Sequence, residues 1–241
     1  MRSLLEAACQ EDAAEAAYAE EQLQRFLQPI ISAKPYIHSV YLYAHNPFNR
    51  FIAGIDEAGR GPLAGPVVAA CCILPKDAVI LYLNDSKKVT ALRREALLPE
   101  IKEKAIAYGI GIVEEKRIDE INILQADYEA MRIAIQQTSA MLRAKGLADA
   151  PGLLLNDAVT IPGVDIPQES IIKGDAKSVS IAAASILAKV TRDHLMEKYD
   201  ALYPEYGFAR NKGYGTKEHI EALKRLGPCP IHRHSFIGHF V

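Results

Sequence analysis

The sequence predicts an α/β domain with a central sheet, preceded by a short extension. From residue 51 onward, short apolar runs typical of strands alternate with helical patterns, which favours a sheet covered by helices. The chain has 241 residues, of which 49% are hydrophobic and 24% are charged. These values are typical of a folded globular chain and exclude the disordered, collagen-like and fibrous classes.

Residues 1–50 are expected to form an N-terminal extension that is partly helical. A stretch rich in Leu, Ala, Gln and Glu over residues 4–28 predicts a helix that ends at Pro29, and the composition changes at Phe51. The N-terminus has no basic segment leading into an apolar one, and no apolar run reaches the ~20 residues that cross a bilayer. We therefore expect a cytoplasmic protein that makes no contact with a membrane.

The region after the extension is predicted to begin with two neighbouring strands. Residues 51–55 form a short apolar run that ends in acids, and residues 65–74 form a valine-rich run, with a glycine-rich turn between them. Three further segments have weaker strand patterns: residues 105–113, which contain Gly109 and Gly111, residues 152–155, and a short element that starts at residues 171–172.

Four segments have helical patterns with recognisable end signals. They are residues 92–104 after Thr90, a single long amphipathic helix over residues 118–145 ended by Gly146, residues 176–202, and residues 216–226 with Thr216 as the cap and Gly227 as the stop. The third of these is apolar nearly all round between residues 179 and 188, which predicts a buried helix.

Charge is unevenly distributed along the chain. Residues 171–241 carry 11 basic and 7 acidic side chains (net +4), whereas residues 51–170 carry 13 basic and 17 acidic ones (net −4). The gradient fits a protein that contacts a polyanion with one part and gathers carboxylates in another, although chance is the alternative. The four cysteines have neither disulfide nor metal-site spacing, and we interpret them as packing thiols.

Three acidic positions lie where predicted core elements end. Asp56 and Glu57 follow the first strand, Asp157 follows residues 152–155, and Asp175 precedes the buried helix. Carboxylates that meet at such ends repel one another unless a cation lies between them, and oxygen ligands without nearby His or Cys favour Mg²⁺ or Mn²⁺ over zinc. The alternatives are a helix cap at Asp175, a turn residue at Asp157 and a solvated first pair.

A dense glycine segment begins at the first acidic pair and runs over residues 56–66. It is not a phosphate-binding P-loop, because the Gly-Lys-Ser/Thr element is missing and a strand replaces the helix that should follow. Gly59 and Gly61 allow the backbone to approach a ligand closely, and Arg60 between them offers a planar donor for phosphate.

Further motifs follow the glycine segment in a fixed order. They are Asn84-Asp85-Ser86-Lys87-Lys88, Lys173-Gly174-Asp175 leading through Ser178 into the run from Ile181 to Asp193, Gly213-Tyr214-Gly215-Thr216, and His232-Arg233-His234-Ser235-Phe236. Together with the glycine segment, they resemble the signature of the type 2 ribonuclease H family (ribonuclease HII) over residues 51 to about 236, roughly three quarters of the chain.

The resemblance implies an RNase H-like fold, in which a five-stranded mixed β-sheet is flanked by helices. The catalytic domain would span residues 51–241, with a helical, substrate-contacting part at about residues 203–241. The family's four catalytic, metal-binding acids map onto Asp56, Glu57, Asp157 and Asp175. Asp175, at a predicted helix start, is expected to stay ionised readily. The related type 3 enzymes usually carry glutamate at this fourth position and a longer N-terminal domain, so Asp175 and the short extension favour type 2.

The implied activity is endonucleolytic hydrolysis of the RNA strand of RNA–DNA hybrids, including cleavage 5′ of single ribonucleotides embedded in duplex DNA. The reaction would leave 3′-hydroxyl and 5′-phosphate ends and would use two divalent ions, Mn²⁺ or Mg²⁺. Ribonucleotide excision and primer removal during DNA replication are the implied roles. We expect a monomer, and the C-terminus has no clamp-binding pattern, which favours an enzyme that acts without a replication clamp. A type 3-like enzyme that prefers longer RNA tracts and a catalytically silent hybrid-binding protein are the two alternatives.

The resemblance also implies how substrate is recognised. The backbone of Gly59, Arg60 and Gly61 would contact the 2′-OH and phosphate groups at the ribonucleotide, and Tyr214 would pack under the adjacent deoxyribose; a simple hinge side chain is the alternative for Tyr214. Candidate phosphate contacts, each of which could also be a solvated charge, are Lys87, Lys88, Lys177, Lys189, Arg192 and Lys217. His232, His234 and His239 are interpreted as structural or surface residues.

Overall fold

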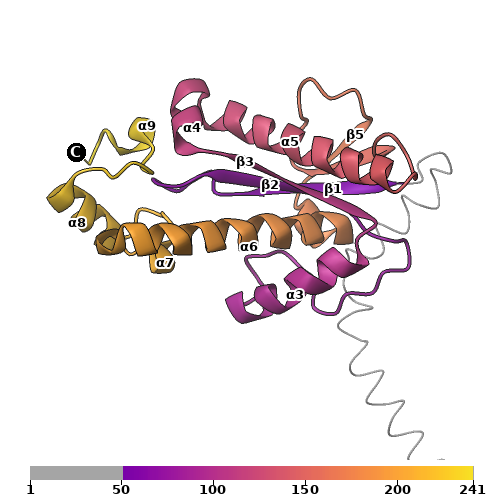
Figure 1. Cartoon of the computed structure of the whole chain (residues 1–241), viewed down its shortest axis with the longest axis horizontal. Coiled ribbons are helices and arrows are strands. Elements are labelled where there is room, and N and C mark those ends of the chain that lie inside the picture. The colour runs from indigo at the N-terminus through magenta and orange to yellow at the C-terminus, as the bar shows by residue number, and fades with distance from the viewer. Residues whose placement is uncertain (1–50, 241) are drawn as a thin grey trace, which may run out of the picture.

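A five-stranded mixed sheet forms the centre of the molecule (Figure 1). The computed structural model describes residues 51–240, so the predicted N-terminal extension lies outside the described residues. The strands are β1 (Ile52–Ala58), β2 (Val67–Ile73), β3 (Ala107–Val113), β4 (Leu153–Asp157) and β5 (Gln168–Ile171), in the order β3-β2-β1-β4-β5. The β1–β2 and β2–β3 pairs are antiparallel, whereas β1–β4 and β4–β5 are parallel. The predicted α/β class and the mixed sheet are confirmed.

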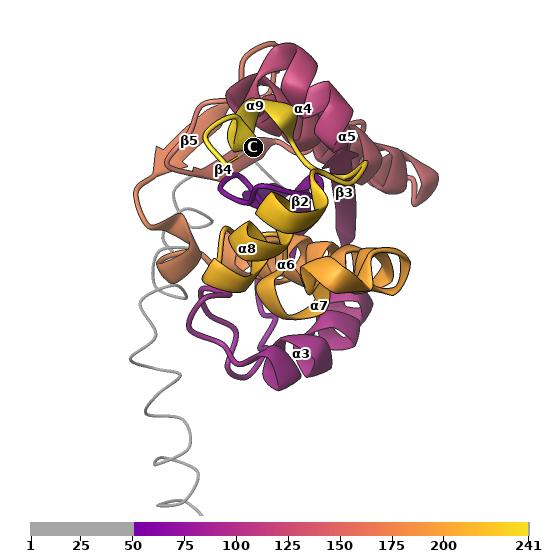
Figure 2. The same cartoon turned by 90° about the vertical axis from the view of Figure 1, so that its left-hand side faces the viewer.

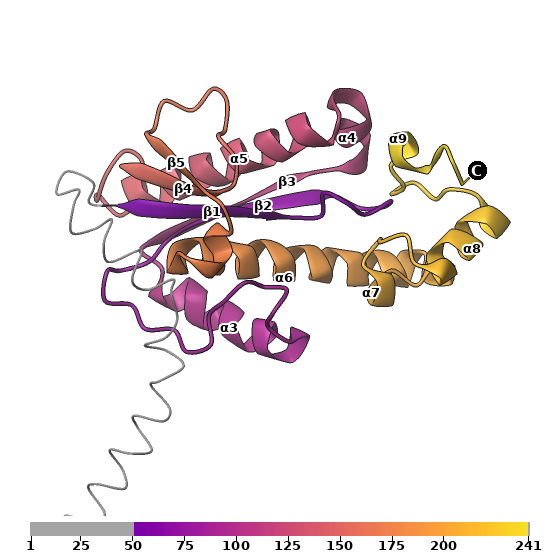
Figure 3. The ribbon, with the colours of Figure 1, turned by 180° about the vertical axis from the view of Figure 1, so that it is seen from behind.

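Two long helices cover the two faces of this sheet (Figures 1 and 2). Helix α5 (Ile123–Ala144) packs on one face and α6 (Val179–Leu202) on the other, so β2 is buried along its whole length. The alanine-rich first half of α6 allows close packing: a Cβ atom on Gly54 of β1 would lie 2.1 Å from the backbone of Ser180 and Ile181. Helix α3 (Ala91–Lys104) packs on the outer side of α6, and the β4–β5 connection rises on the α5 side (Figure 3).

The two glycines that weaken the pattern of β3 have a structural reason. A Cβ atom on Gly109 would lie 2.2 Å from the carbonyl oxygen of Ala134, and one on Gly111 would lie 1.9 Å from that of Ala130. Helix α5 therefore rests directly on the backbone of β3, and both positions exclude any side chain. The strand predicted over residues 105–113 is confirmed, and its glycines favour the fold rather than oppose it.

The single helix predicted over residues 118–145 is wrong, because the chain forms two helices there. Helix α4 (Glu115–Ile121) ends at Asn122, whose φ of 67° lies in the left-handed region. The Asn122 side chain then caps α5 by accepting hydrogen bonds from the backbone N–H groups of Leu124 and Gln125. Asn122, a residue type common at helix caps, thus separates α4 from α5, although the apolar pattern continues through both helices.

Other boundaries differ by a few residues. The element before the buried helix is a 3₁₀ turn, η1 (Gly174–Ala176), and α6 begins only after Ser178, whose hydroxyl accepts from the N–H of Ile181. Strand β5 begins before residue 171 rather than at it. Thr90 caps α3, and Thr216 and Gly227 flank the last predicted helix, as expected.

The C-terminal part gathers at the far end of α6, beside the turn between β1 and β2 (Figure 2). Its elements are η2 (Pro204–Tyr206), α7 (Phe208–Asn211), α8 (Lys217–Leu226) and α9 (His234–Ile237). An isolated bridge pairs Ala64 with His232, and a small apolar core joins Ala64 to Phe208 and Ile231. No helix within residues 51–240 is long and apolar enough to cross a membrane.

Candidate active site

The four predicted acids come together where β1 and β4 end. Asp56 lies on β1, and Asp157 is the last residue of the parallel neighbour β4, one position beyond the Ile55–Asn156 pair. The backbone N–H of Gly174 donates to Asp157 Oδ1 at 2.7 Å, and this contact brings the η1 turn with Asp175 to the same edge. The prediction that strand ends would gather these side chains is therefore supported by the register of the sheet.

These carboxyl groups repel one another in a poorly solvated place. Burial, followed by the charge of Glu57, raises the pKa of Asp56 well above its usual value. Burial and then Asp127 raise the pKa of Glu57 to about 7, while burial, Asp85 and Asp157 raise the pKa of Asp175. This direction is opposite to the one expected for an acid at a helix start, because desolvation and neighbouring acids outweigh the backbone hydrogen bond from Ala176 that lowers the pKa of Asp175.

The donor set fits a hard divalent cation. The four side chains offer only carboxylate oxygens, and a cation would offset the repulsion that adds to burial in raising the pKa values of Asp56, Glu57 and Asp175. As they stand in residues 51–240, no three His, Cys, Asp or Glu side chains are arranged to hold one ion together. Ligation would therefore require side-chain adjustment at the cluster.

A fifth acid, Asp127 of α5, lies beside this cluster and was not predicted. Its side chain is fully buried, and neither carboxylate oxygen has a hydrogen-bond partner. Its charged neighbour is Arg60, with 3.4 Å between Arg60 Nε and Asp127 Oδ2, and Arg60 also lies 3.7 Å from Glu57. Burial raises the pKa of Asp127 to about 7 despite this arginine. The helical pattern could have placed Asp127 on the inner face of α5, where an acid is unusual.

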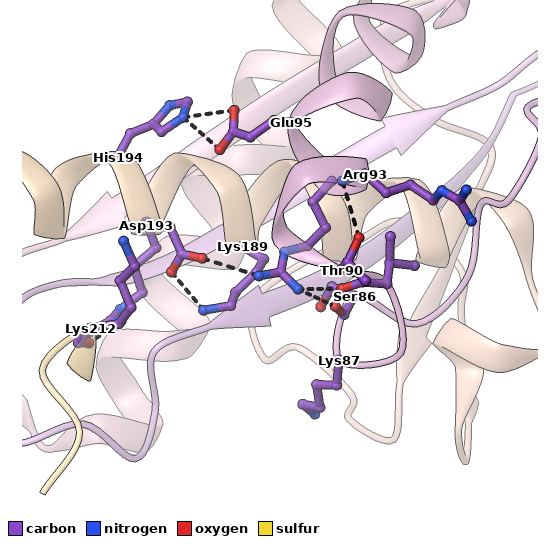
Figure 4. A network of polar contacts seen from close by, with 12 residues as sticks. Ser86, Lys87, Thr90, Arg93, Glu95, Lys189, Asp193, His194 and Lys212 are labelled. Carbon is purple, nitrogen blue, oxygen red and sulfur yellow. Dashed lines mark hydrogen bonds and ion pairs between the residues drawn. The ribbon is translucent and has the colours of Figure 1, made fainter. Parts of the chain in front are cut away.

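The loop over residues 84–88 lies against α6 and contacts it through Ser86 (Figure 4). The motif was recognised in the sequence, but this contact was not predicted. The Ser185 hydroxyl contacts Ser86 Oγ at 2.8 Å and also the Asp56 carboxyl group. Arg94 secures the loop by donating to the backbone carbonyls of Ser86 and Val89 and by pairing with Asp193 of α6. The loop, α6 and strand β1, which carries Asp56, are thus joined through polar contacts.

The predicted phosphate contacts separate into two groups. Lys87, Lys88 and Lys217 are exposed and Lys177 is half-buried, so these four remain predictions. Lys189 donates to Asp193 at 2.6 Å (Figure 4). The prediction for Arg192 is wrong: its side chain is 1% exposed, and its three nitrogen atoms donate to the backbone carbonyls of Pro66, Ala64 and Lys212.

Arg192 and Arg233 together hold the glycine segment from behind. Arg233 is fully buried and donates to the carbonyls of Gly59, Arg60 and Gly65 at 2.6–3.0 Å. Burial lowers the pKa of Arg192 to about 10 and that of Arg233 to about 9. These two guanidinium groups donate hydrogen bonds to six backbone carbonyls, five of them in the glycine segment and one at Lys212.

Tyr214 stands at the opposite side of the same segment. Its side chain is 46% exposed, and a Cβ atom on Gly61 would lie 3.8 Å from Tyr214 Cε1, so the ring and the glycine are neighbours. A backbone hydrogen bond from Leu63 to Gly213 links the two turns directly. The structure therefore brings the predicted recognition residues Gly61 and Tyr214 together.

Solved structures share this architecture and define the class of protein. The ribonuclease H2 from Pyrococcus horikoshii OT3 superposes with a TM-score of 0.61 and 29% identity, covering 77% of this chain and 93% of that one. The ribonuclease HII in a PCNA complex from Archaeoglobus fulgidus gives a TM-score of 0.59 and 26% identity, covering 78% and 96%. The fold is RNase H-like, as the resemblance implied.

Sequence comparisons identify the family within this class. The ribonuclease HII family model matches residues 53–239. Ribonuclease HII of Lachnoclostridium phytofermentans is 65% identical over 191 residues, covering 79% of this chain and 72% of that protein. Ribonuclease HII of Caldanaerobacter subterraneus subsp. tengcongensis is 54% identical over 219 residues, covering 91% and 86%. The chain belongs to the ribonuclease HII family, and it is an endoribonuclease that acts on the RNA of RNA–DNA hybrids.

Proposed function

We propose that the protein also nicks 5′ of single ribonucleotides in duplex DNA, and that hydrolysis uses two divalent ions held by Asp56, Glu57, Asp157 and Asp175. The observation that carries this proposal is the meeting of these acids at adjoining strand ends, beside a glycine segment whose carbonyls are tied back. Manganese and magnesium both suit the all-oxygen donor set.

Two metal ions supply an activated water, in-line geometry and neutralisation of the leaving oxygen. The chain's own residues prepare the place for this reaction. The N–H of Gly174 fixes Asp157, the Ser185 hydroxyl contacts Asp56, and Arg60 lies beside Glu57. These contacts orient Asp157, Asp56 and Glu57, and the side chains would still have to adjust to hold a cation together with Asp175. The products would carry 3′-hydroxyl and 5′-phosphate ends.

Selection of the ribonucleotide would come from the two turns that meet at Gly61 and Tyr214. With the carbonyls of Gly59 and Arg60 bonded to Arg233, the backbone N–H groups of this turn are the atoms left to meet 2′-OH and phosphate oxygens. The exposed ring of Tyr214 offers a flat surface for the deoxyribose that follows the ribonucleotide. Ribonucleotide excision and removal of primer ends would be the biological roles.

The exposed lysines would add affinity that does not depend on sequence. Lys87 and Lys88 lie on the loop that contacts α6, and Lys217 lies at the start of α8. Phosphate contacts of this kind weaken steeply as salt rises, because binding releases condensed counterions. Lys87 also attracts the Glu57 carboxylate, which places its charge near the acid cluster.

The test uses a labelled DNA duplex that carries one ribonucleotide, incubated with Mn²⁺, Mg²⁺ or EDTA. Wild type should nick 5′ of the ribonucleotide only when a metal ion is present, and Asp175→Asn should lower kcat at least about 10³-fold. Asp165→Asn, which removes an exposed acid from the β4–β5 connection, is the matched control and should retain activity.

Two outcomes would contradict the proposal. Cleavage of a four-ribonucleotide tract without cleavage at the single ribonucleotide would indicate type 3-like specificity. Binding of both duplexes without metal-dependent cleavage would mean that the acids are not a working metal site.

A further inference from the structure

Behind Tyr214 lies a pair of buried histidines that the reaction does not use. His219 of α8 and His232 are 0% and 1% exposed, and their Nε2 atoms lie 3.0 Å apart. The rings of Phe208 and Tyr206 pack against them, with centroids 5.3 Å from His219 and 5.0 Å from His232, respectively. The pair is thus sealed within an aromatic shell, directly under the turn that carries Tyr214.

The hydrogen bonds of this pair fix which ring nitrogen carries each proton. His219 Nδ1 lies 2.8 Å from the carbonyl oxygen of Tyr214, and a carbonyl can only accept, so Nδ1 donates. The N–H of Cys229 donates to His232 Nδ1 at 2.9 Å, which is shorter than the 3.3 Å between Nδ1 and the Cys229 carbonyl oxygen, so we place the proton of a neutral His232 on Nε2. His232 Nε2–H then donates to the bare Nε2 of His219, and every ring nitrogen is satisfied in one arrangement of protons.

Three hydrogen bonds in series connect Cys229 to the backbone of Tyr214. This chain of hydrogen bonds, the relay, runs from Cys229 N–H through His232 and His219 to the Tyr214 carbonyl. The same carbonyl also accepts from the N–H of Thr216 at 2.8 Å. The His232 segment is in turn paired with the glycine segment through the Ala64–His232 bridge. The histidine pair therefore lies between the two turns that would recognise substrate.

We propose that the His219–His232 pair is a positioning unit for Tyr214, which sets the preference of the enzyme for a ribonucleotide followed by DNA. The inference rests on the proposed role of Tyr214 at that junction. Neither histidine touches substrate: His219 acts through the Tyr214 carbonyl and holds the ring in the place where it meets a deoxyribose. Without the Nδ1 donor, the Tyr214 carbonyl keeps only the N–H of Thr216, so the turn between Gly213 and Gly215 is held less firmly and the ring loses its fixed place.

Two substitutions at His219 separate the two halves of the relay. In His219→Asn, the side-chain Nδ2 occupies about the place of the histidine Nδ1, so the donor to Tyr214 is kept while the contact with His232 is lost. In His219→Gln, the amide reaches toward His232 instead, and the donor to Tyr214 is lost. The two variants have similar polarity, and each removes the imidazole, which makes them matched partners.

The readout is the ratio of kcat/KM for a duplex with one ribonucleotide to kcat/KM for a continuous RNA–DNA hybrid. Partial unfolding lowers both values by the same factor and leaves this ratio unchanged, so a purely structural defect is not registered. We expect His219→Gln to lower the ratio about 10-fold, which corresponds to the loss of one buried hydrogen bond, and His219→Asn to stay within about twofold of wild type.

Tyr214→Ala gives the scale for these changes. It should lower the ratio at least as much as His219→Gln does, and the double variant should be no worse than Tyr214→Ala alone, since no ring is left to position. If Tyr214→Ala lowers the ratio but His219→Gln does not, or if His219→Asn falls as far as His219→Gln, the positioning role is overturned while the proposed function stands. If Tyr214→Ala leaves the ratio unchanged, the junction role of Tyr214 fails as well.

A spectroscopic measurement on the intact protein tests the relay independently. The ¹⁵N shifts of the ring nitrogens should show a proton on Nδ1 of His219 and on Nε2 of His232 at neutral pH. The opposite tautomer at either ring would remove the donor path to the Tyr214 carbonyl and would overturn the proposal.

Discussion

The two sides of the candidate active site are built on opposite principles. On the acid side, burial and then neighbouring carboxyl groups raise the pKa values of Asp56 and Glu57, and the fully buried Asp127 has no hydrogen-bond partner. On the C-terminal side, the buried side chains of Arg192, Arg233, His219 and His232 all have hydrogen-bond partners. The acid side is destabilised by buried, mutually repelling carboxylates, whereas the buried polar groups named on the C-terminal side have their hydrogen bonds.

The contrast shows which part of the site is preformed. The glycine segment, whose role in recognition is proposed, is held in place without substrate, because its carbonyls are already bonded to buried arginines. The acid cluster is unstable by itself and gains most from a bound cation. Three predictions test this division, beginning with the largest expected effect.

Arg233→Met should cost more stability than any other single change on the C-terminal side. It leaves the carbonyls of Gly59, Arg60 and Gly65 without their donor, and we expect the free energy of unfolding to fall by about 4 kcal/mol. Urea denaturation followed by circular dichroism measures this. Arg225→Met, at an exposed arginine of α8, is the matched control and should change stability by about 0.5 kcal/mol or less. Equal losses for the two variants would show that Arg233 does not hold the turn.

Asp127→Asn should stabilise the metal-free protein. The pKa of Asp127 is about 7 in the folded state, above its usual value of 3.8, so wild type loses stability as pH rises between these two values. The neutral amide avoids that loss, and we expect a gain of about 2 kcal/mol at pH 8 that disappears below about pH 4. Urea unfolding across this range measures it, with the exposed Asp77→Asn as control. A loss of stability at pH 8 would mean that the pairing of Asp127 with Arg60 outweighs its burial.

His232→Asn tests the C-terminal side, where stability should change with pH in the opposite direction. Burial and then His219 lower the pKa of His232 from 6.5 to about 4. Between these two pH values the unfolded chain binds a proton at His232 and the folded protein does not. Wild type should therefore lose about 2 kcal/mol as pH falls from about 6.5 to 4, and the variant should lose less. The measurement is the difference in unfolding free energy between the two proteins at several pH values. Parallel curves would contradict a buried neutral pair.

Much of the sheet could be predicted because its signals are local. Strand β2 is an unbroken apolar run, and the acids of β1 and β4 follow apolar runs, with only Asn156 between Leu155 and Asp157. The break at Asn122 could not be predicted from amphipathic period alone, because α4 and α5 bury the same kind of face. Gly109 and Gly111 weakened the strand prediction for β3, because glycine is unfavourable in a strand. They are required by the close approach of the α5 backbone, and a local pattern does not show that contact.

In the candidate site, too, residues marked by local sequence signals could be predicted, and residues placed by long-range packing could not. Asp56, Glu57, Asp157 and Asp175 could be chosen from their places at element ends, and the resemblance supplied their roles. Asp127 was missed because nothing local marks it: only the packing of α5 brings it to Arg60. Arg192 was misassigned because a basic residue on a helix usually faces solvent, whereas here it turns inward to three carbonyls.

The bonds of Arg233 also bear on when the enzyme becomes competent during synthesis. Arg233 and its partners Gly59 and Arg60 are 174 and 173 residues apart in the chain. A ribosome that has made all four acids has not yet made the arginine that holds the glycine segment. A nascent chain that stops short of residue 233 would therefore carry the acids without these hydrogen bonds. Closing such a long loop is slow relative to local folding, so the fixed shape of the glycine segment should be the last feature of the site that the new molecule acquires.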